Sequence, residues 1–446
     1  MKHRNHKQRP RFALKWRRHG GRVSAGTDAG TFLAHKPMST VDSLSYGMKP
    51  TSYEFSRSDV SQFCGHSPHG YALNPYYDSL KPLLLVMRAM GVLPLTSEAG
   101  GAVVFSWMSL AMLYSACLYW LLCLGVWFTN ENRMQAIREA NGRFEDSVDA
   151  YMLFVYLVPL VHLPFTHWRE AAKVARYLND WSTFQSHYRQ VTGANLVLPL
   201  KRRCLTAVLL TLSLSHISIL ASCGFVIAVK NIPDEILYSY LVSLMNVSGV
   251  YWYFTFTALS RSAVALEESL SKTLDKSPMW ATVLAQYRLL WLDLSHLATQ
   301  TGAASCYTCG CYLVHQFLMV ATSAYATLSD AIAGNFDSRL LSICATFSAS
   351  MILAICEGAN NVFLKANVAF QKKLLRLQTA TYNKETNLQV STFLQTISAE
   401  PPVISLGGYV RINRELLVAV STHALASLRS HAVSVCSERQ AEFCTY

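Results

Sequence analysis

The chain has 446 residues, of which 51% are hydrophobic and only 15% charged, and its mean hydropathy is +0.21. This composition is atypical of soluble domains and indicates several apolar helices that cross a bilayer. The net charge of +12 is spread between apolar blocks rather than along one soluble face, which favours orientation in a membrane over nucleic-acid binding. We therefore predict an all-α membrane protein with no nucleic-acid partner.

Residues 1–80 are predicted to form a basic cytoplasmic tail that is largely disordered. Residues 1–22 contain nine Lys or Arg and no acid, and no apolar stretch of signal-peptide length follows them. Such a charge run attracts anionic lipid. Residues 81–95 are apolar with Arg88 inside, a length typical of an interfacial helix rather than a span.

Residues 81–364 are predicted to form the transmembrane helical domain. Each of six stretches is long and apolar enough to cross a hydrocarbon core of about 30 Å. We place these six transmembrane helices at residues 102–128, 148–168, 204–229, 236–260, 303–328 and 340–364.

The charges between the predicted spans indicate their orientation, because cytoplasmic connections are enriched in Lys and Arg. Connections 169–203 and 365–414 are strongly basic, whereas 130–147, 231–235 and 329–338 carry net negative charge. We therefore place the basic connections and the N-terminus in the cytoplasm.

Two cytoplasmic segments have the apolar spacing of helices. Apolar residues recur at helical intervals within 261–302, beginning at Tyr287, and within the connection 365–414, beginning at Val390. We predict long helices that extend into a cytoplasmic base, where they pack within one chain or against a neighbouring subunit.

Residues 415–446 are predicted to form a truncated or atypical seventh span and a C-terminal tail. As a helix, the apolar stretch 416–428 covers about 20 Å, less than the hydrocarbon core of about 30 Å. A full crossing would carry Arg429 and His431 into the membrane, at a cost of roughly 2.5–3.5 kcal/mol for an arginine at the centre.

Few residue patterns indicate chemistry. Cys306, Cys309 and Cys311 have a spacing found at metal sites, but no second Cys or His pair accompanies them, which favours small residues at a helix contact. No hydrolase, metalloprotease or nucleotide-binding fingerprint occurs in a supporting context. We predict that the protein is not an enzyme and has no cofactor and no metal site.

Polar side chains in the outward halves of the predicted spans form the candidate ligand site. Mixed aromatic and hydrogen-bonding groups line pockets for small molecules, although an aromatic belt at the membrane interface is the stronger interpretation for Tyr238 and Tyr240. The sixth predicted span contains Glu357, which we expect to face protein or water because an unpaired charge in lipid is costly. The predicted ligand-binding residues are Tyr151, Tyr156, Tyr240, Ser243, Asn246, Gln316 and Tyr325.

A closing pattern follows the six spans: Phe393-Leu394-Gln395, Ile404-Ser405-Leu406, Gly408-Tyr409 and Asn413-Arg414-Glu415-Leu416. With the cytoplasmic N-terminus and the long helical connection before the fifth span, this pattern resembles the insect gustatory receptor family over residues 81–420. The closing pattern is most similar to the carbon-dioxide-receptor branch, and the sugar-receptor branch stays open.

The resemblance implies a seven-span, ligand-gated cation channel of four related subunits, as a homomer or a heteromer. It implies a multi-pass receptor in the dendritic membrane of a sensory neuron, in contact with membrane lipid and gated by a small ligand such as carbon dioxide or a sugar. It further implies a pore lined by the seventh helices. The corresponding pore or gating region comprises Glu357, Leu416, Leu417, Ser421 and His423.

The sequence departs from the family at the seventh span. Family members close with Thr-Tyr, an apolar run and Gln-Phe, whereas this chain runs from His423 through Arg429 to His431. Four Arg429 side chains in a pore would repel a cation. We therefore predict that the chain conducts poorly by itself, and we interpret its final segment as an alternative or mis-joined coding end.

Two rival functions stay open at this point. A G-protein-coupled receptor requires an outside N-terminus, against which the charge asymmetry argues. A polytopic transporter predicts internal repeats with broken helices at matching positions, and the sequence shows none.

Overall fold

The computed structural model describes residues 74–98, 101–139, 148–225, 232–333, 339–380, 383–419 and 422. The chain divides into two units, Met1–Pro68 and His69–Tyr446, and every described residue belongs to the second. The predicted basic tail up to residue 73 and most of the predicted seventh span lie outside the described residues.

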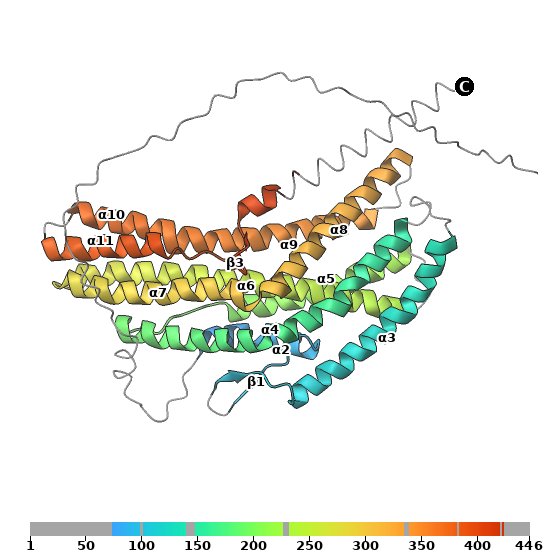
Figure 1. The fold of residues 1–446 in the computed structure, drawn as a ribbon, viewed down its shortest axis with the longest axis horizontal. Helices are drawn as coiled ribbons and strands as arrows, with labels where there is room; N and C mark the ends of the chain where they lie inside the picture. The colour runs from blue at the N-terminus through green and yellow to red at the C-terminus, as the bar shows by residue number, and fades with distance from the viewer. Residues whose placement is uncertain are drawn as a thin grey trace, which may run out of the picture. The chain divides into compact units, whose positions relative to one another are not determined.

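Long α-helices make up nearly all of the described chain (Figure 1). A π-helical turn, η2 (Leu364–Ala369), joins α9 to α10. The predominance of α-helices confirms the predicted all-α fold class. The helices are α2 (Pro75–Ala89), α3 (Leu110–Glu139), α4 (Val148–Thr192), α5 (Lys201–Phe225), α6 (Ile232–Lys276), α7 (Trp280–Ala304), α8 (Cys306–Ala333), α9 (Arg339–Phe363), α10 (Phe370–Ala380) and α11 (Lys384–Ala399).

Helix α2 begins before the predicted end of the tail. The side chain of Asn74 accepts a hydrogen bond from the Tyr77 amide, and Pro75 occupies the start of the helix, where its missing N–H costs nothing. The buried face of α2 includes Leu80, Leu83 and Met87. The predicted boundary at residue 80 was therefore wrong, because residues 75–80 belong to the folded core. The helix also ends at Ala89, short of residue 95.

The first predicted span also begins too early. Strands β1 (Thr96–Ser97) and β2 (Val103–Val104) form an antiparallel hairpin, and α3 starts only at Leu110. Asn179 of α4 holds this hairpin, because its side chain accepts from the Val103 amide and donates to the Val103 carbonyl, both at 2.9 Å. Apolar composition alone placed residues 102–109 in the span, but they precede α3, and the backbone of Val103 is hydrogen-bonded to α4.

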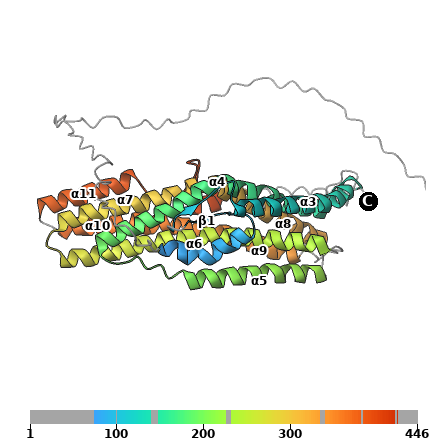
Figure 2. The same cartoon turned by 90° about the horizontal axis from the view of Figure 1, so that it is seen from below.

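Helices α4 and α6 continue far beyond the predicted spans. Each has 45 residues, a length of about 68 Å, which is roughly twice the hydrocarbon core of a bilayer. Their far ends pack with α7, while α11 packs on α7 and α10 (Figures 1 and 2). The helices predicted from the apolar spacing within 261–302 and 365–414 are therefore present.

Two stretches of the described helices are long and apolar enough to cross a membrane on their own. They are Leu110–Glu131 in α3 and Ala345–Gln378 across α9, η2 and α10. Large side chains on α3 are exposed, among them Trp120, Trp127 and Phe128, as expected of a helix that faces lipid. The other four predicted crossings stay predictions.

Buried aromatic rings join the helices at two levels. Tyr76 of α2 stacks on Trp181 of α4 with ring centroids 4.1 Å apart. Further along, the Trp291 Nε1–H donates to the Ala366 carbonyl in η2 at 2.7 Å, and Phe393 of α11 packs edge-on against the same indole. Trp291 therefore binds a carbonyl in the π-helical turn, where the regular α-helical pattern is interrupted.

A second hairpin packs where α7 meets α8. Strands β3 (Ser405–Leu406) and β4 (Val410–Arg411) pair antiparallel, and Gly407 and Gly408 form the turn with φ of 59° and 83°. β3 contacts both α7 and α8. A Cβ atom on Gly302 of α7 would lie 2.2 Å from the Ser405 carbonyl oxygen, so this approach requires glycine.

We expect Gly302→Ala to displace the β3–β4 hairpin and to destabilise the protein by about 1–3 kcal/mol, because the clash is with backbone rather than a flexible side chain. The melting temperature of the purified chain in detergent measures this. Gly310→Ala is the matched control, since its Cβ would meet Leu406 at 3.9 Å, an ordinary contact. Equal melting temperatures for both variants would contradict the tight packing.

Candidate functional site

Helix α8 starts at a sharp break in the chain. Ser305 ends α7, and α8 begins at Cys306 without an acidic residue in its own first turn. The first N–H groups of any helix lack partners inside that helix. Here the partner comes from α4, because Glu170 accepts from the Tyr307 amide at 2.9 Å, the Thr308 amide at 2.9 Å and the Thr308 hydroxyl at 2.7 Å.

The Glu170 side chain is only 1% exposed, so its charge needs compensation from the protein. The positive end of the α8 dipole and three short hydrogen bonds provide it. A second link lies beside it, because the Arg169 guanidinium is 4.5 Å from the centroid of the Tyr307 ring. No local pattern in the sequence marks Glu170 as a helix cap, because it caps a helix that begins about 137 positions further along the chain.

Helix α7 is fastened to α4 at the same level. The Thr301 hydroxyl donates to the Tyr177 hydroxyl oxygen at 2.9 Å. Burial raises the pKa of Tyr177, so its hydroxyl keeps its proton. The α7–α8 junction, which we define as Gly302, Ser305 and Thr308, is thus held by α4 on one side and by the β3–β4 hairpin on the other.

A small cavity adjoins this junction. It is lined by side chains that include Met87, His167, Glu170, Trp252 and Thr308, and it has room for about one water molecule. Among the described residues the buried Trp252 Nε1–H has no hydrogen-bond partner. None of the seven predicted ligand-binding residues lines this cavity.

Three predicted ligand-binding residues make polar contacts deep among the helices. The Tyr156 hydroxyl of α4 lies 2.9 Å from the Ser323 hydroxyl of α8. Asn246 of α6 donates to the Ser215 hydroxyl of α5 at 2.8 Å. Gln316 donates to the Tyr312 hydroxyl at 2.8 Å.

The Tyr312 hydroxyl, in turn, lies against Gly249 of α6. These contacts link α8 to α4 and α6, and α6 to α5. The ligand-binding set stays a prediction.

The remaining predicted ligand-binding residues differ in their surroundings. Tyr240 donates to the Met90 carbonyl just beyond α2. Ser243 is 4% exposed, and its hydroxyl has no hydrogen-bond partner among the described residues. Tyr325 is half-buried on α8, and Tyr151 lies on α4 with its side chain outside the description. Ser243 is therefore the member of the set whose buried hydroxyl lacks a hydrogen-bond partner among the described residues.

Glu357 of α9 has a protein partner that the sequence analysis did not identify. Arg414 donates to its two carboxylate oxygens, from Nε at 2.6 Å and from a terminal nitrogen at 2.7 Å. Asn361, one turn further along α9, donates to the same carboxylate at 3.3 Å. Such a paired geometry fixes Arg414 in orientation as well as position.

Arg414 stands at the start of the final helical turn. The Asn413 side chain accepts from the Leu416 amide at 3.1 Å, the geometry of a helix cap. Leu416 and Leu417 are half-buried and pack against the core. Ser421 and His423, the other predicted pore or gating residues, lie outside the described residues.

The long helices, their buried polar links and the anchored start of a final helix define an all-α bundle of long helices. The sequence profile of the 7tm chemosensory receptor family matches residues 80–425. The chain belongs to this family and is a member of the insect gustatory receptor group.

Three relatives show the extent of the similarity. The chain is 31% identical to gustatory and odorant receptor 24 of Anopheles gambiae over 370 residues, which cover 82% of this chain and 80% of the relative. It is 28% identical to receptor 22 of the same mosquito, over 77% of this chain and 75% of that one. It is 26% identical to receptor 21a of Drosophila melanogaster, over 77% of each chain.

The fold is similar to that of a solved insect receptor. Olfactory receptor OR5 of Machilis hrabei superposes with a TM-score of 0.53 at 12% identity, over 78% of this chain and 96% of that one. Its structure in complex with eugenol gives the same TM-score, over 95% of that chain. At this identity the likeness concerns the fold.

We expect Glu170→Gln to destabilise the protein by about 1–3 kcal/mol, because the amide offers one acceptor oxygen where the carboxylate offers two and turns a donor toward the Thr308 amide. A lower melting temperature in detergent is the readout. The exposed Asp275 near the end of α6 supplies the control, since Asp275→Asn removes the same charge without a buried bond. The role of the cap is refuted if both variants melt alike.

Proposed function

We propose that the chain is a subunit of a ligand-gated cation channel that responds to carbon dioxide or a sugar. The observation that carries this proposal is a family match over most of the chain, together with a fold like that of an insect olfactory receptor solved with a small ligand. Ligand binding without covalent chemistry fits a helical bundle in which polar groups are buried between helices.

The proposed topology has six crossings, an atypical seventh and a cytoplasmic N-terminus. The basic connections support this orientation, since Lys and Arg concentrate on the cytoplasmic side of membrane proteins. In this orientation α7, α10, α11 and the far ends of α4 and α6 form the cytoplasmic base. The dendritic membrane of a sensory neuron is the proposed location.

The proposed ligand site lies in the outer half of the bundle, among the seven predicted residues. Ser243 offers an unpaired buried hydroxyl on α6, and Asn246 lies about one turn further on the same helix. Tyr156 of α4 contacts Ser323 of α8, and Gln316 bonds to Tyr312 of α8, whose hydroxyl lies against Gly249 of α6. A ligand that bonds Ser243 would therefore act on helices that also carry the interhelical hydrogen bonds.

The proposed gating element is the ion pair between Glu357 and Arg414. It ties the sixth predicted span to the first turn of the final helix, the segment that would line the pore with Leu416, Leu417, Ser421 and His423. Because Arg414 follows directly on the β3–β4 hairpin, a shift of α8 at the junction would reach the final helix through a short, hydrogen-bonded path.

The functional assembly is proposed to be a homo- or heterotetramer with related receptor subunits. With Arg429 in the final segment, a pore made of this chain alone would repel cations. A related subunit with a family-type seventh span would supply the conducting surface, and this chain would then contribute ligand recognition.

Expression in a non-neuronal cell, with and without related subunits, tests the function. We expect a ligand-evoked cation current to carbon dioxide or to one member of a sugar panel when a related subunit is present, and little current without it. A chain grafted with a family-type seventh span after Val420 should conduct alone. An equally large current from the unmodified chain would refute the proposed defect. Digestion of a tagged N-terminus by protease added to intact cells would refute the cytoplasmic orientation.

In the conducting complex we expect Glu357→Gln and Arg414→Gln each to reduce the ligand-evoked current by about fivefold or more, because each variant uncouples the final helix from α9. The charge-swapped pair, Glu357→Arg with Arg414→Glu, should restore part of the current. Surface expression of each variant is the control. Single variants with wild-type current would exclude the pair from gating.

A further inference from the structure

Three consecutive cations begin α5 without a counter-charge. Lys201, Arg202 and Arg203 are all exposed, and the described ion pairs of the chain involve none of them. The first turn of α5 contains no acid. Since the start of a helix itself carries partial positive charge, the dipole adds to the three side chains. The result is a concentrated positive site on the described surface.

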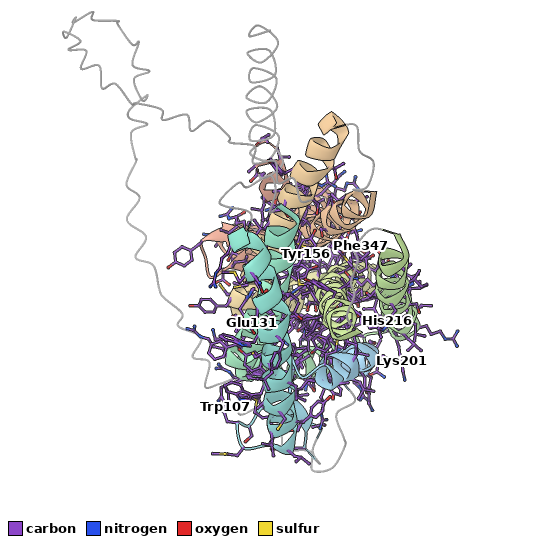
Figure 3. All side chains as sticks on the ribbon, turned by 90° about the vertical axis from the view of Figure 1, so that its right-hand side faces the viewer. Trp107, Glu131, Tyr156, Lys201, His216 and Phe347 are labelled. Carbon is purple, nitrogen blue, oxygen red and sulfur yellow. The ribbon has the colours of Figure 1, made fainter. Side chains whose placement is uncertain are left out.

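The outer face of α5 continues this site as an apolar stripe. The helix packs on α2 and α6 through a face that includes Cys204 and Val208, and its opposite face is exposed. Figure 2 shows α5 along one edge of the helices, and Figure 3 labels Lys201 and His216 of this helix. Five apolar residues on this face are each about half exposed or more, with exposed Thr206, Ser213 and His216 between them. We call these five, Leu205, Leu209, Leu210, Leu214 and Ile217, the stripe.

The stripe has the length of one membrane leaflet. From Leu205 to Ile217 the helix rises about 18 Å, and half of the hydrocarbon core is about 15 Å. Val197, in the segment just before the cations, is 77% exposed, as expected of a residue at the membrane surface. A soluble anion would satisfy the cations but leave the stripe bare, whereas a phospholipid covers both.

We propose that this surface, the α5 lipid site, binds an anionic phospholipid of the cytoplasmic leaflet. The headgroup phosphate pairs with Lys201, Arg202 and Arg203, and an acyl chain lies along the stripe. The cytoplasmic leaflet carries the anionic lipids that attract such basic clusters. The leaflet assignment rests on the proposed orientation of the receptor.

The α5 lipid site is connected to the proposed ligand site. Ser215, on the buried face of α5, accepts the hydrogen bond of Asn246. A lipid that fixes α5 therefore also fixes the partner of a predicted ligand-binding residue. The bound lipid stabilises the arrangement of α5 and α6 from which ligand recognition starts.

Lipid binding to the purified full chain tests the proposal without any current. The chain in detergent is titrated with phosphatidylserine, with phosphatidylcholine and with soluble phosphoserine, and bound molecules are counted by native mass spectrometry. We expect retention of phosphatidylserine, weak retention of phosphatidylcholine and no retention of phosphoserine. Arg202→Gln with Arg203→Gln should weaken phosphatidylserine binding about 30-fold, since each cation contributes about one factor of five near an anionic headgroup.

The matched control is Lys372→Gln with Lys373→Gln on α10, which lowers the net charge equally at another site. It should leave phosphatidylserine binding unchanged. Leu209→Ser with Leu210→Ser tests the stripe and should weaken binding of the long-chain lipid more than that of a short-chain analogue. Melting temperatures in lipid-free detergent verify that each variant is folded.

Three results would overturn the proposal. They are equal retention of both lipids, an equal loss of binding in the α10 control, and retention of phosphoserine as strong as that of the lipid, which would indicate a site for a soluble anion. None of these results depends on ligand-evoked current. Failure of the α5 lipid site would thus be distinguishable from failure of the proposed channel function.

Discussion

The buried carboxylate of Glu170 sets where α8 begins, and the surrounding arrangement depends on it. A helix end inside the protein requires partners for its free N–H groups, and a buried carboxylate requires donors. At the α4–α8 contact the free N–H groups of α8 donate to the Glu170 carboxylate, so both groups are paired. Because the bonds are short and directional, they fix the position of α8 along α4 more narrowly than apolar packing does.

The junction also explains the closing pattern of the sequence. The turn Gly407-Gly408 provides the left-handed backbone that reverses the chain, and Gly302 removes the side chain that would otherwise hold β3 away from α7. The hairpin places Arg414 beside α9, where its guanidinium donates hydrogen bonds to the Glu357 carboxylate. Residues that are spread over more than a hundred positions thus form one continuous path from α4 to the last described turn.

Hydrogen bonds between the long helices serve packing and recognition together. Polar pairs such as Tyr156 with Ser323, and Asn246 with Ser215, hold helices at defined points in a bundle that exposes many large apolar side chains. In lipid the hydrophobic effect does not favour one helix pairing over another, so polar pairs of this kind add directional contacts to close packing. A ligand among them would exchange one set of hydrogen bonds for another, which is a direct way to move a helix.

The sequence by itself determined the helical class, the approximate place of each long helix and the extra helices at 261–302 and 365–414, because apolar periodicity is a local property. Only the tertiary structure decided that residues 75–80 join the core and that α3 starts at Leu110. It also decided that Glu170 caps α8 and that Arg414 pairs with Glu357. Those outcomes depend on contacts between residues far apart in the chain, whose geometry no local pattern encodes.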